Sequence, residues 1–215
     1  MIKRIIPIML LSCLLGGCVT NNTPLPPDDG HTEPGEGEEL PPEEEMVTIL
    51  DDLTGSFNAG TELSHDNNYD KFIAHLNKKD EGLVKSGYFR NVYAQTDGLD
   101  NHIFTTIGTG SKEGTFRITF EKTVKEVNLV LASFYKSYGS STNPTHNTYT
   151  AWFEVNAGGT RTTGYLRPNE TATGPLLNEI KLSMAEGNYI EVMGEMDKAG
   201  ATDYRVVIRS LSVSY

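Results

Sequence analysis

The distribution of apolar residues divides this chain into three parts. Residues 5–15 form a short apolar run, residues 19–46 hold few apolar side chains, and residues 47–215 carry the repeating patterns of a folded domain. In the third part most apolar positions recur at every second residue, which is the period of β-strands. The pattern therefore predicts one β-rich domain that follows a segment without a core.

The clearest strand prediction covers residues 116–120, where three apolar side chains alternate with Arg117 and Thr119. Residues 126–135 are apolar on both faces, as expected of a strand in the middle of a sheet. The other strands are predicted at residues 47–50, 88–95, 102–107, 148–155, 160–166, 177–183, 188–193 and 204–215. In the last of these the apolar phase slips, and a β-bulge near Arg209 and Ser210 would restore it.

One segment has the helical period, and a short helix is predicted near residues 69–77. Its apolar face would consist of Tyr69, Phe72, Ile73 and Leu76, at positions i, i+3, i+4 and i+7. Residues 51–68 and 136–147 are predicted to be loops. Short strands separated by turn signals predict an all-β fold, an antiparallel β-sandwich that is jelly-roll-like.

The N-terminus has the layout of a secretory signal. Lys3 and Arg4 precede an apolar run that is too short for a bilayer span, which needs roughly 20 residues. The stretch Leu15-Gly16-Gly17-Cys18 resembles the lipobox of bacterial lipoproteins. The resemblance implies that residues 1–17 are a lipoprotein signal peptide and that Cys18 is diacylated and becomes the new N-terminus. The alternative is an ordinary signal peptide with a chance cysteine.

Residues 18–46 are predicted to be the lipidated cysteine followed by a disordered tether. The segment carries nine acidic residues, no lysine or arginine, and six of the ten prolines of the chain. Such a composition cannot bury enough apolar surface to offset the entropy of folding. The folded domain is then predicted at residues 47–215. With a net charge of −11 the chain lacks the basic field that nucleic-acid phosphates require, so no nucleic-acid partner is expected.

Several stretches of the domain resemble galactose-binding-like jelly rolls, which include carbohydrate-binding modules. These stretches are residues 114–120, 124–131, 152–159 and 204–213. The resemblance covers roughly residues 47–215. It implies a β-sandwich whose loops at one end often bind sugars, sometimes with a structural calcium.

Three residues are candidates for ligand binding, because aromatic faces stack on pyranose rings. Tyr138 and His146 belong to the predicted loop 136–147, and Trp152 follows it. Trp152 is the only tryptophan, and two interpretations stay open for it: a filler of the core or a platform for a ligand.

A calcium site is the one candidate metal site. Asp66, Asn68 and Asp70 have the i, i+2, i+4 spacing that can direct oxygens at one hard cation. The alternative is that residues 66–68 cap the helix that follows them.

No catalytic constellation is found. The domain has no Gly-x-Ser-x-Gly elbow, no His-Glu-x-x-His pair and no phosphate-binding loop. The sequence therefore predicts a non-enzymatic lipoprotein, lipid-anchored at the bacterial cell envelope on the extracytoplasmic side, with the choice between inner and outer membrane open. Its β-sandwich would bind a ligand, with carbohydrate as the first candidate. The alternatives are a structural or protein-binding envelope lipoprotein and a secreted hydrolase.

Replacing Cys18 with serine tests the anchor. Since a diacylated cysteine holds a protein at a bilayer through the burial of its acyl chains, Cys18→Ser should move the protein from the membrane fraction to the soluble fraction. Fractionation followed by immunoblotting measures this, with Cys13→Ser as the matched control. Retention of Cys18→Ser in the membrane fraction would contradict the lipobox interpretation.

Overall fold

The computed structural model describes residues 45–96, 102–135, 137–140, 143–146, 149–168, 175–195 and 197–215, with residues 137–146 described by their backbone alone. The chain divides into two units, Met1–Pro41 and Pro42–Tyr215, and all described residues belong to the second. The predicted signal peptide, Cys18 and nearly all of the predicted tether lie outside the described residues.

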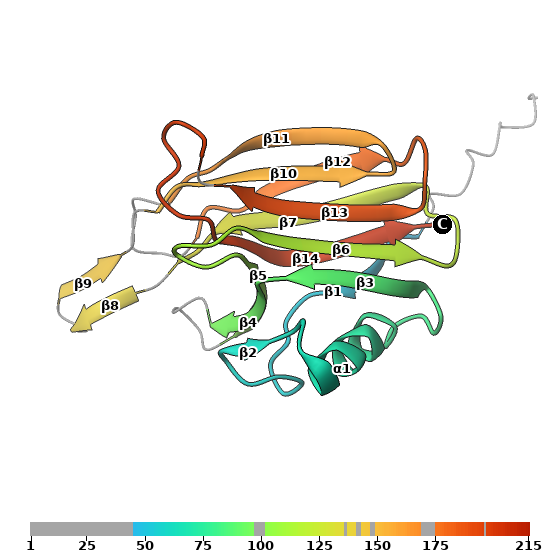
Figure 1. The fold of residues 1–215 in the computed structure, drawn as a ribbon, viewed down its shortest axis with the longest axis horizontal. Helices are drawn as coiled ribbons and strands as arrows, with labels where there is room; N and C mark the ends of the chain where they lie inside the picture. Colours follow the sequence, from blue (N-terminus) through green and yellow to red (C-terminus); the bar gives the residue numbers. More distant parts are fainter. Residues whose placement is uncertain are drawn as a thin grey trace, which may run out of the picture. The chain divides into compact units, whose positions relative to one another are not determined.

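Two antiparallel sheets face each other in the second unit (Figure 1). The seven-stranded sheet contains, in spatial order, β12 (Asn178–Ser183), β7 (Glu126–Ser133), β14 (Val206–Ser214), β5 (Ile103–Ile107), β4 (Val92–Thr96) and β2 (Thr61–Glu62), and β1 (Val47–Leu50) pairs with β14. The five-stranded sheet contains β11 (Thr160–Leu166), β10 (Ala151–Ala157), β13 (Tyr189–Glu195), β6 (Gly114–Phe120) and β3 (Val84–Arg90). The chain changes sheet at each step from β11 to β14, as in jelly rolls. The predicted all-β antiparallel sandwich is thus confirmed.

The core consists of the inward faces of both sheets. Phe116, Ile118 and Phe120 of β6 are buried, whereas Arg117 and Thr119 between them are only partly buried, which confirms the predicted alternation. Burial of each large apolar side chain contributes about 1.5–3 kcal/mol relative to exposure. The apolar strand predicted at residues 126–135 is β7, and it lies between β12 and β14 inside its sheet.

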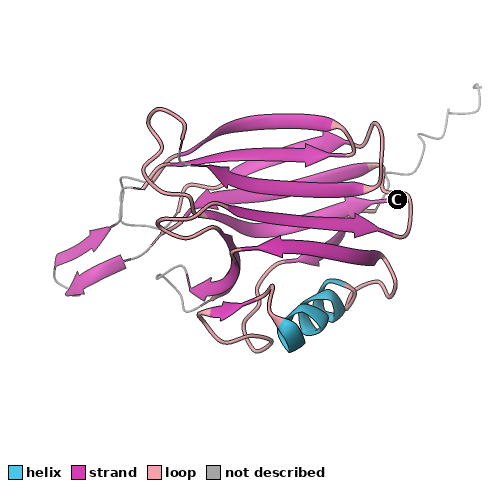
Figure 2. Cartoon of the chain, in the orientation of Figure 1, coloured by secondary structure: helices cyan, strands magenta, loops and turns pink. Residues whose placement is uncertain are grey.

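The predicted helix is confirmed as α1, which spans Asp66–Leu76 and begins three residues earlier than expected. Phe72 is fully buried, and its ring lies 5.8 Å from Phe57, 5.1 Å from Phe89 and 6.3 Å from Phe116. This aromatic cluster joins the helix to the five-stranded sheet. Figure 2 shows α1 beside the strands; among the described residues no helix is long and apolar enough to cross a bilayer.

The single strand predicted at residues 88–95 is wrong. Asn91 has a positive φ of 51°, and its side-chain amide donates to the carbonyl oxygen of Glu113 at 2.6 Å. This left-handed residue separates β3 from β4, which belong to different sheets. The alternation of apolar and polar residues in this segment is imperfect because its two halves belong to different sheets, and each half has its own core-facing positions.

Both loop predictions need correction as well. The segment predicted as the loop 136–147 contains β8 (Ser137–Ser140) and β9 (Asn143–His146), which form an antiparallel hairpin. The segment 51–68 contains β2 and the first turn of α1. β2 has only two residues, too few to show a period in the sequence.

The predicted β-bulge is confirmed. The register of β14 against β7 shifts between Ile208 and Ser210, so that Ile208 and Leu211 are both buried in the core. One extra residue reverses the facing of all residues beyond it. The core-facing residues of β14 are therefore even-numbered before the bulge, such as Ile208, and odd-numbered after it, such as Leu211.

Glycine is required where the start of β14 lies against β13. A Cβ atom on Gly194 would lie 2.1 Å from the carbonyl oxygen of Tyr204. Since this neighbour is backbone, it cannot rotate away. The two chain segments can approach this closely only because residue 194 has no side chain.

We expect Gly194→Ala to destabilise the domain by about 1–3 kcal/mol, the usual cost of overpacking. Urea denaturation followed by circular dichroism measures the change. Gly110→Ala is the control, because its nearest neighbour, Oδ2 of Asp203, would lie 4.0 Å from the new Cβ, an ordinary contact. Equal stability of the two variants would contradict the packing argument.

Candidate functional site

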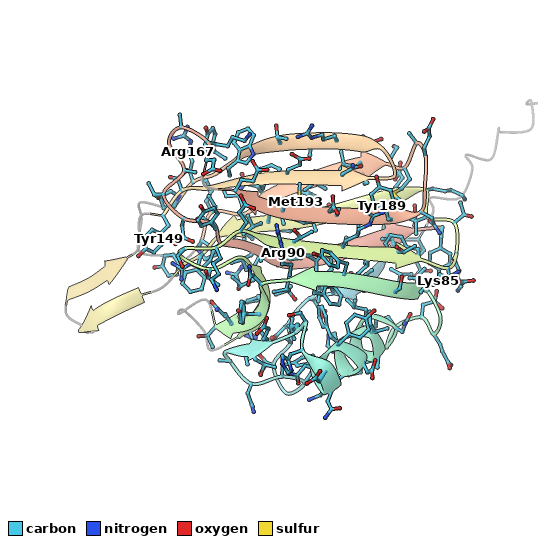
Figure 3. All side chains as sticks on the ribbon, viewed as in Figure 1. Lys85, Arg90, Tyr149, Arg167, Tyr189 and Met193 are labelled. Carbon is cyan, nitrogen blue, oxygen red and sulfur yellow. The ribbon has the colours of Figure 1, made fainter. Side chains whose placement is uncertain are left out.

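The outer face of the five-stranded sheet carries polar and aromatic side chains. Buried and partly buried residues alternate along β10 and β13, so every second side chain points away from the core. The strand registers align these side chains in rows across the sheet. We call this face the platform; it is formed by Tyr88, Arg90, Thr115, Arg117, Trp152, Glu154, Asn156, Arg161, Thr163, Tyr165, Tyr189, Glu191, Met193 and Glu195. Figure 3 shows Arg90, Tyr189 and Met193 over it.

Trp152 lies on the platform and not in the core between the sheets. It is opposite Tyr165 in the β10–β11 hairpin, and the two rings pack edge to face with centroids 4.8 Å apart. On its other side it is opposite Glu195 of β13. The indole is partly buried and has a neighbouring aromatic ring at its side. Of the two interpretations of Trp152, the structure therefore excludes a filler of the sandwich core.

The turn at residues 197–200 packs beside this aromatic pair. The Tyr165 hydroxyl donates to the carbonyl oxygen of Ala199 at 2.6 Å. The Lys198 ammonium lies 5.8 Å from the centre of the Trp152 ring and 3.3 Å from a Glu195 carboxylate oxygen. Nε1 of Trp152 is inaccessible and donates no hydrogen bond to the described residues. These contacts hold both rings in place, and they leave the indole N–H without an acceptor among the residues that the structure describes.

Charged side chains in the middle of the platform are paired with one another. Arg161 of β11 forms an ion pair with Glu154 of β10. The Arg117 guanidinium lies 3.7 Å from a Glu191 carboxylate oxygen and 4.1 Å from the centre of the Tyr189 ring. The platform thus offers hydrogen-bonding groups whose charges are compensated locally.

Aromatic residues stand at both ends of the platform. Glu195, which is opposite Trp152, is six residues from Tyr189 on the same strand. At about 3.3 Å per residue this separation is roughly 20 Å. Tyr88 lies opposite Arg117, in the same row as Glu191 and two residues along the sheet from the row of Tyr189, and is more than half exposed. An extended ligand with apolar faces and polar edges would match this arrangement.

Sequence reasoning missed Tyr165, Tyr189 and Tyr88. A signal existed for Tyr165: the hairpin turn at residues 156–159 pairs Ala157 with Thr160, and counting back from that pair places Tyr165 opposite Trp152. No such signal existed for Tyr189, because β13 pairs with β6, a strand about seventy residues earlier in the chain.

The other two predicted ligand-binding residues lie on the β8–β9 hairpin. The backbone register pairs Tyr138 with Thr145 and His146 with Ser137. Their side chains are outside the described part of the structure. Their role in ligand binding stays a prediction.

The three predicted calcium ligands all lie in α1, and the helix does not bring them together. Asp66 and Asp70 are one turn apart on one side, whereas Asn68 points elsewhere and donates to the carbonyl oxygen of Glu62 at 3.1 Å. Among the described residues no group of three or more His, Cys, Asp or Glu side chains could hold a metal ion. The calcium site stays a prediction. The capping alternative is wrong, since the N-cap residue is His65 and its side chain makes no capping hydrogen bond.

A second polar cluster joins the segment after β1 to the start of β5. Asp52 accepts hydrogen bonds from the Thr54 hydroxyl at 2.5 Å, from the Thr54 N–H at 2.8 Å, and from His102 and the Ile103 N–H. A polar cavity of about 390 Å³ lies beside it, lined also by His75. Burial tends to raise the pKa of Asp52, but the hydrogen bonds outweigh it and lower that pKa to about 2. Burial lowers the pKa of His75.

The lowered pKa of Asp52 has a consequence for acid stability. Its carboxylate stabilises the fold fully above the unfolded value of 3.8, and this contribution is lost as the pH falls towards 2. We expect Asp52→Asn to be less stable than the wild type at neutral pH and to show a smaller loss of stability between these values. Urea midpoints measured across that range test this. Asp51→Asn is the matched control, because it removes the same formal charge at the adjacent residue and leaves the hydrogen bonds of Asp52 in place.

Comparison with known proteins supplies no family. No protein-family model matches the chain, and no curated protein matches it. Several solved structures are similar at low identity. The carbohydrate-binding module CBM36 in complex with calcium and xylotriose is 10% identical, with 61% of this chain and 92% of that chain covered and a TM-score of 0.31.

Two further solved structures are similar to the same degree. CBM35 from Paenibacillus barcinonensis is 9% identical over 60% of this chain and 92% of that chain, with a TM-score of 0.35. A family 35 carbohydrate-binding module from Clostridium thermocellum is 9% identical over 62% of this chain and 90% of that chain, with a TM-score of 0.33. These scores lie below the level that marks a shared fold, so function has to be inferred from the residues of this chain.

Proposed function

We propose that this protein is a lipid-anchored, extracytoplasmic binding module that holds a carbohydrate on the platform. One observation carries the proposal: the Trp152–Tyr165 pair stands at the end of outward-facing rows of hydrogen-bonding side chains. A sugar ring has apolar C–H faces and a rim of hydroxyl groups. Aromatic side chains suit the faces, and a few placed polar groups suit the rim.

The polar groups that follow the aromatic pair along the platform can both donate and accept. Glu154 in the next row and Glu191 in the row after it offer carboxylate oxygens. Asn156, opposite Glu191, offers its side-chain N–H groups, since its side-chain oxygen accepts from the Gly159 N–H at 3.1 Å. The carboxylates are already oriented by Arg161 and Arg117. Groups held in this way lose little side-chain entropy when a ligand binds, which favours affinity.

The charge pattern favours an uncharged ligand. Because Arg161 and Arg117 are paired with carboxylates of the same face, the middle of the platform presents no uncompensated charge of either sign. An anionic or cationic ligand would have to displace these ion pairs. A neutral saccharide would not.

The spacing of the aromatic residues favours an oligosaccharide over a monosaccharide. Trp152 and Tyr165 lie at one end of the platform, and Tyr189 lies at the other, roughly 20 Å away along the strands. Tyr88 lies between them along the strand direction, roughly 13 Å from the row of Trp152. A ligand that contacts both ends must have several sugar units.

Binding is proposed in place of hydrolysis. A glycosidase uses two carboxyl groups that flank the scissile bond, one of them as an acid. On the platform Glu154 and Glu191 are each held by an arginine, and they belong to one open face. In the proposed role, a predicted anchor at Cys18 keeps the module at the envelope.

Removing either ring of the aromatic pair tests the proposal. We expect Trp152→Ala and Tyr165→Ala to weaken binding by about 2 kcal/mol or more, which is roughly thirtyfold in Kd. A glycan array identifies the ligand, and isothermal titration calorimetry measures the affinities. Tyr93→Ala is the matched control, because Tyr93 lies on the outer face of the other sheet, opposite Thr106.

The proposal is contradicted if the wild type binds no neutral glycan on the array, or if both platform variants bind as tightly as the wild type does. Loss of binding in Tyr93→Ala alone would place the site on the other sheet.

A further inference from the structure

β12 is an edge strand of the seven-stranded sheet. Within the described part of the chain it pairs with β7 and with no other strand. Figure 1 shows it at the border of that sheet. An edge strand presents a row of backbone N–H and C=O groups on which another strand can pair.

The backbone groups that point away from β7 can be identified. Asn178 to Ser183 pair with Leu131 to Glu126, and the N–H of Met184 donates to the carbonyl oxygen of Lys125 at 2.7 Å. In an antiparallel ladder the bonded pairs alternate, so the even-numbered residues of β12 bond to β7. The carbonyl oxygen of Ser183, an odd-numbered residue, points away from β7 and accepts from the Thr160 hydroxyl at 2.9 Å, which agrees with this pattern. Glu179 and Lys181 therefore direct their N–H and C=O groups outward.

We propose that β12 pairs with β12 of a second copy of this chain, antiparallel and about a twofold axis at Ile180. In this register Glu179 is opposite Lys181 of the second copy, and the reverse holds by symmetry. These two residues then exchange backbone hydrogen bonds through the groups that point outward. Edge-to-edge addition of a strand in this way is a common mode of association.

The charges of β12 select this register. The side chains of Glu179 and Lys181 are 54% and 74% exposed. With the axis at Ile180, each acid faces a base across the interface, which is favourable for directly opposed residues. Moving the axis to Lys181 would oppose two lysines, and moving it to Glu179 would oppose two glutamates. A slip of one residue would mismatch the faces of the two sheets.

Exposed apolar side chains gather at the same edge. Leu176 and Leu177, directly before β12, are 46% and 56% exposed, and Met46 is 37% exposed. Met46 lines a cavity of about 210 Å³ together with Leu182 and Ser183 of β12. The proposed register brings Leu177 opposite Ser183 of the second copy, at the border of that cavity. A second copy would therefore cover apolar surface that one copy leaves in water.

The dimer would be closed, because a twofold contact uses the same edge of both copies. The platform lies on the other sheet, so pairing through β12 leaves both platforms accessible. Two platforms on one particle would raise the avidity for a repetitive ligand without any new contact. This consequence rests on the proposed function, but the dimer itself does not.

Charge exchange tests the interface. The full chain carrying Cys18→Ser, so that no acyl anchor drives association, is examined by sedimentation velocity over a wide range of concentration. We expect a dimer. Adding Lys181→Glu should abolish the dimer, because glutamates are then opposed twice, and the double change Glu179→Lys with Lys181→Glu should restore it. Lys85→Glu, on the edge strand of the other sheet, is the matched control and should stay dimeric.

A second variant probes the backbone. Lys181→Pro removes an N–H that the ladder with β7 does not use, so circular dichroism should show a folded protein that is monomeric. The proposal is overturned if the wild-type edge gives a monomer at every concentration, if Lys181→Glu or Lys181→Pro folds and stays dimeric, if the double exchange stays monomeric, or if assemblies larger than a dimer form.

Discussion

The contact of Phe116 with Phe89 and Phe72 sets the orientation of the five-stranded sheet. The three rings lie within 6.3 Å of one another by their centroids, and all are buried. Since successive residues of a strand point to opposite faces, burial of Phe116 turns Arg117 outward, and burial of Phe89 turns Tyr88 outward. The platform is therefore the outer face of the same sheet whose inner face carries these buried rings.

The two proposed surfaces follow from different properties of the strands. The platform depends on side chains that the pairing of neighbouring strands brings together, with Tyr165 opposite Trp152 and Arg161 diagonal to Glu154. The β12 edge depends on backbone groups that pair with no other strand of the described part of the chain on one side. Because a sandwich turns its platform and its edge in different directions, one domain can bind a ligand and associate without competition between the two.

Most of the fold was predictable from the apolar pattern. Strands with a strict period, such as residues 116–120, and the phase slip near Arg209 and Ser210 were found because they rest on local alternation. The break at Asn91 was not found, since an asparagine with positive φ leaves no mark in a pattern of apolar residues. The β8–β9 hairpin was missed because its residues are polar on both faces.

The sequence by itself determined the class of fold. It also predicts the extent of the domain and, through a stretch that resembles a lipobox, the lipidation of Cys18. Those properties depend on composition and on neighbours along the chain. Only the tertiary structure decided that Trp152 faces outward beside Tyr165, that Tyr189 shares its face, and that Asp66, Asn68 and Asp70 are spread around a helix. Which side chains become neighbours depends on pairing between strands that are distant in the sequence. That pairing cannot be predicted from the residue pattern of any single segment.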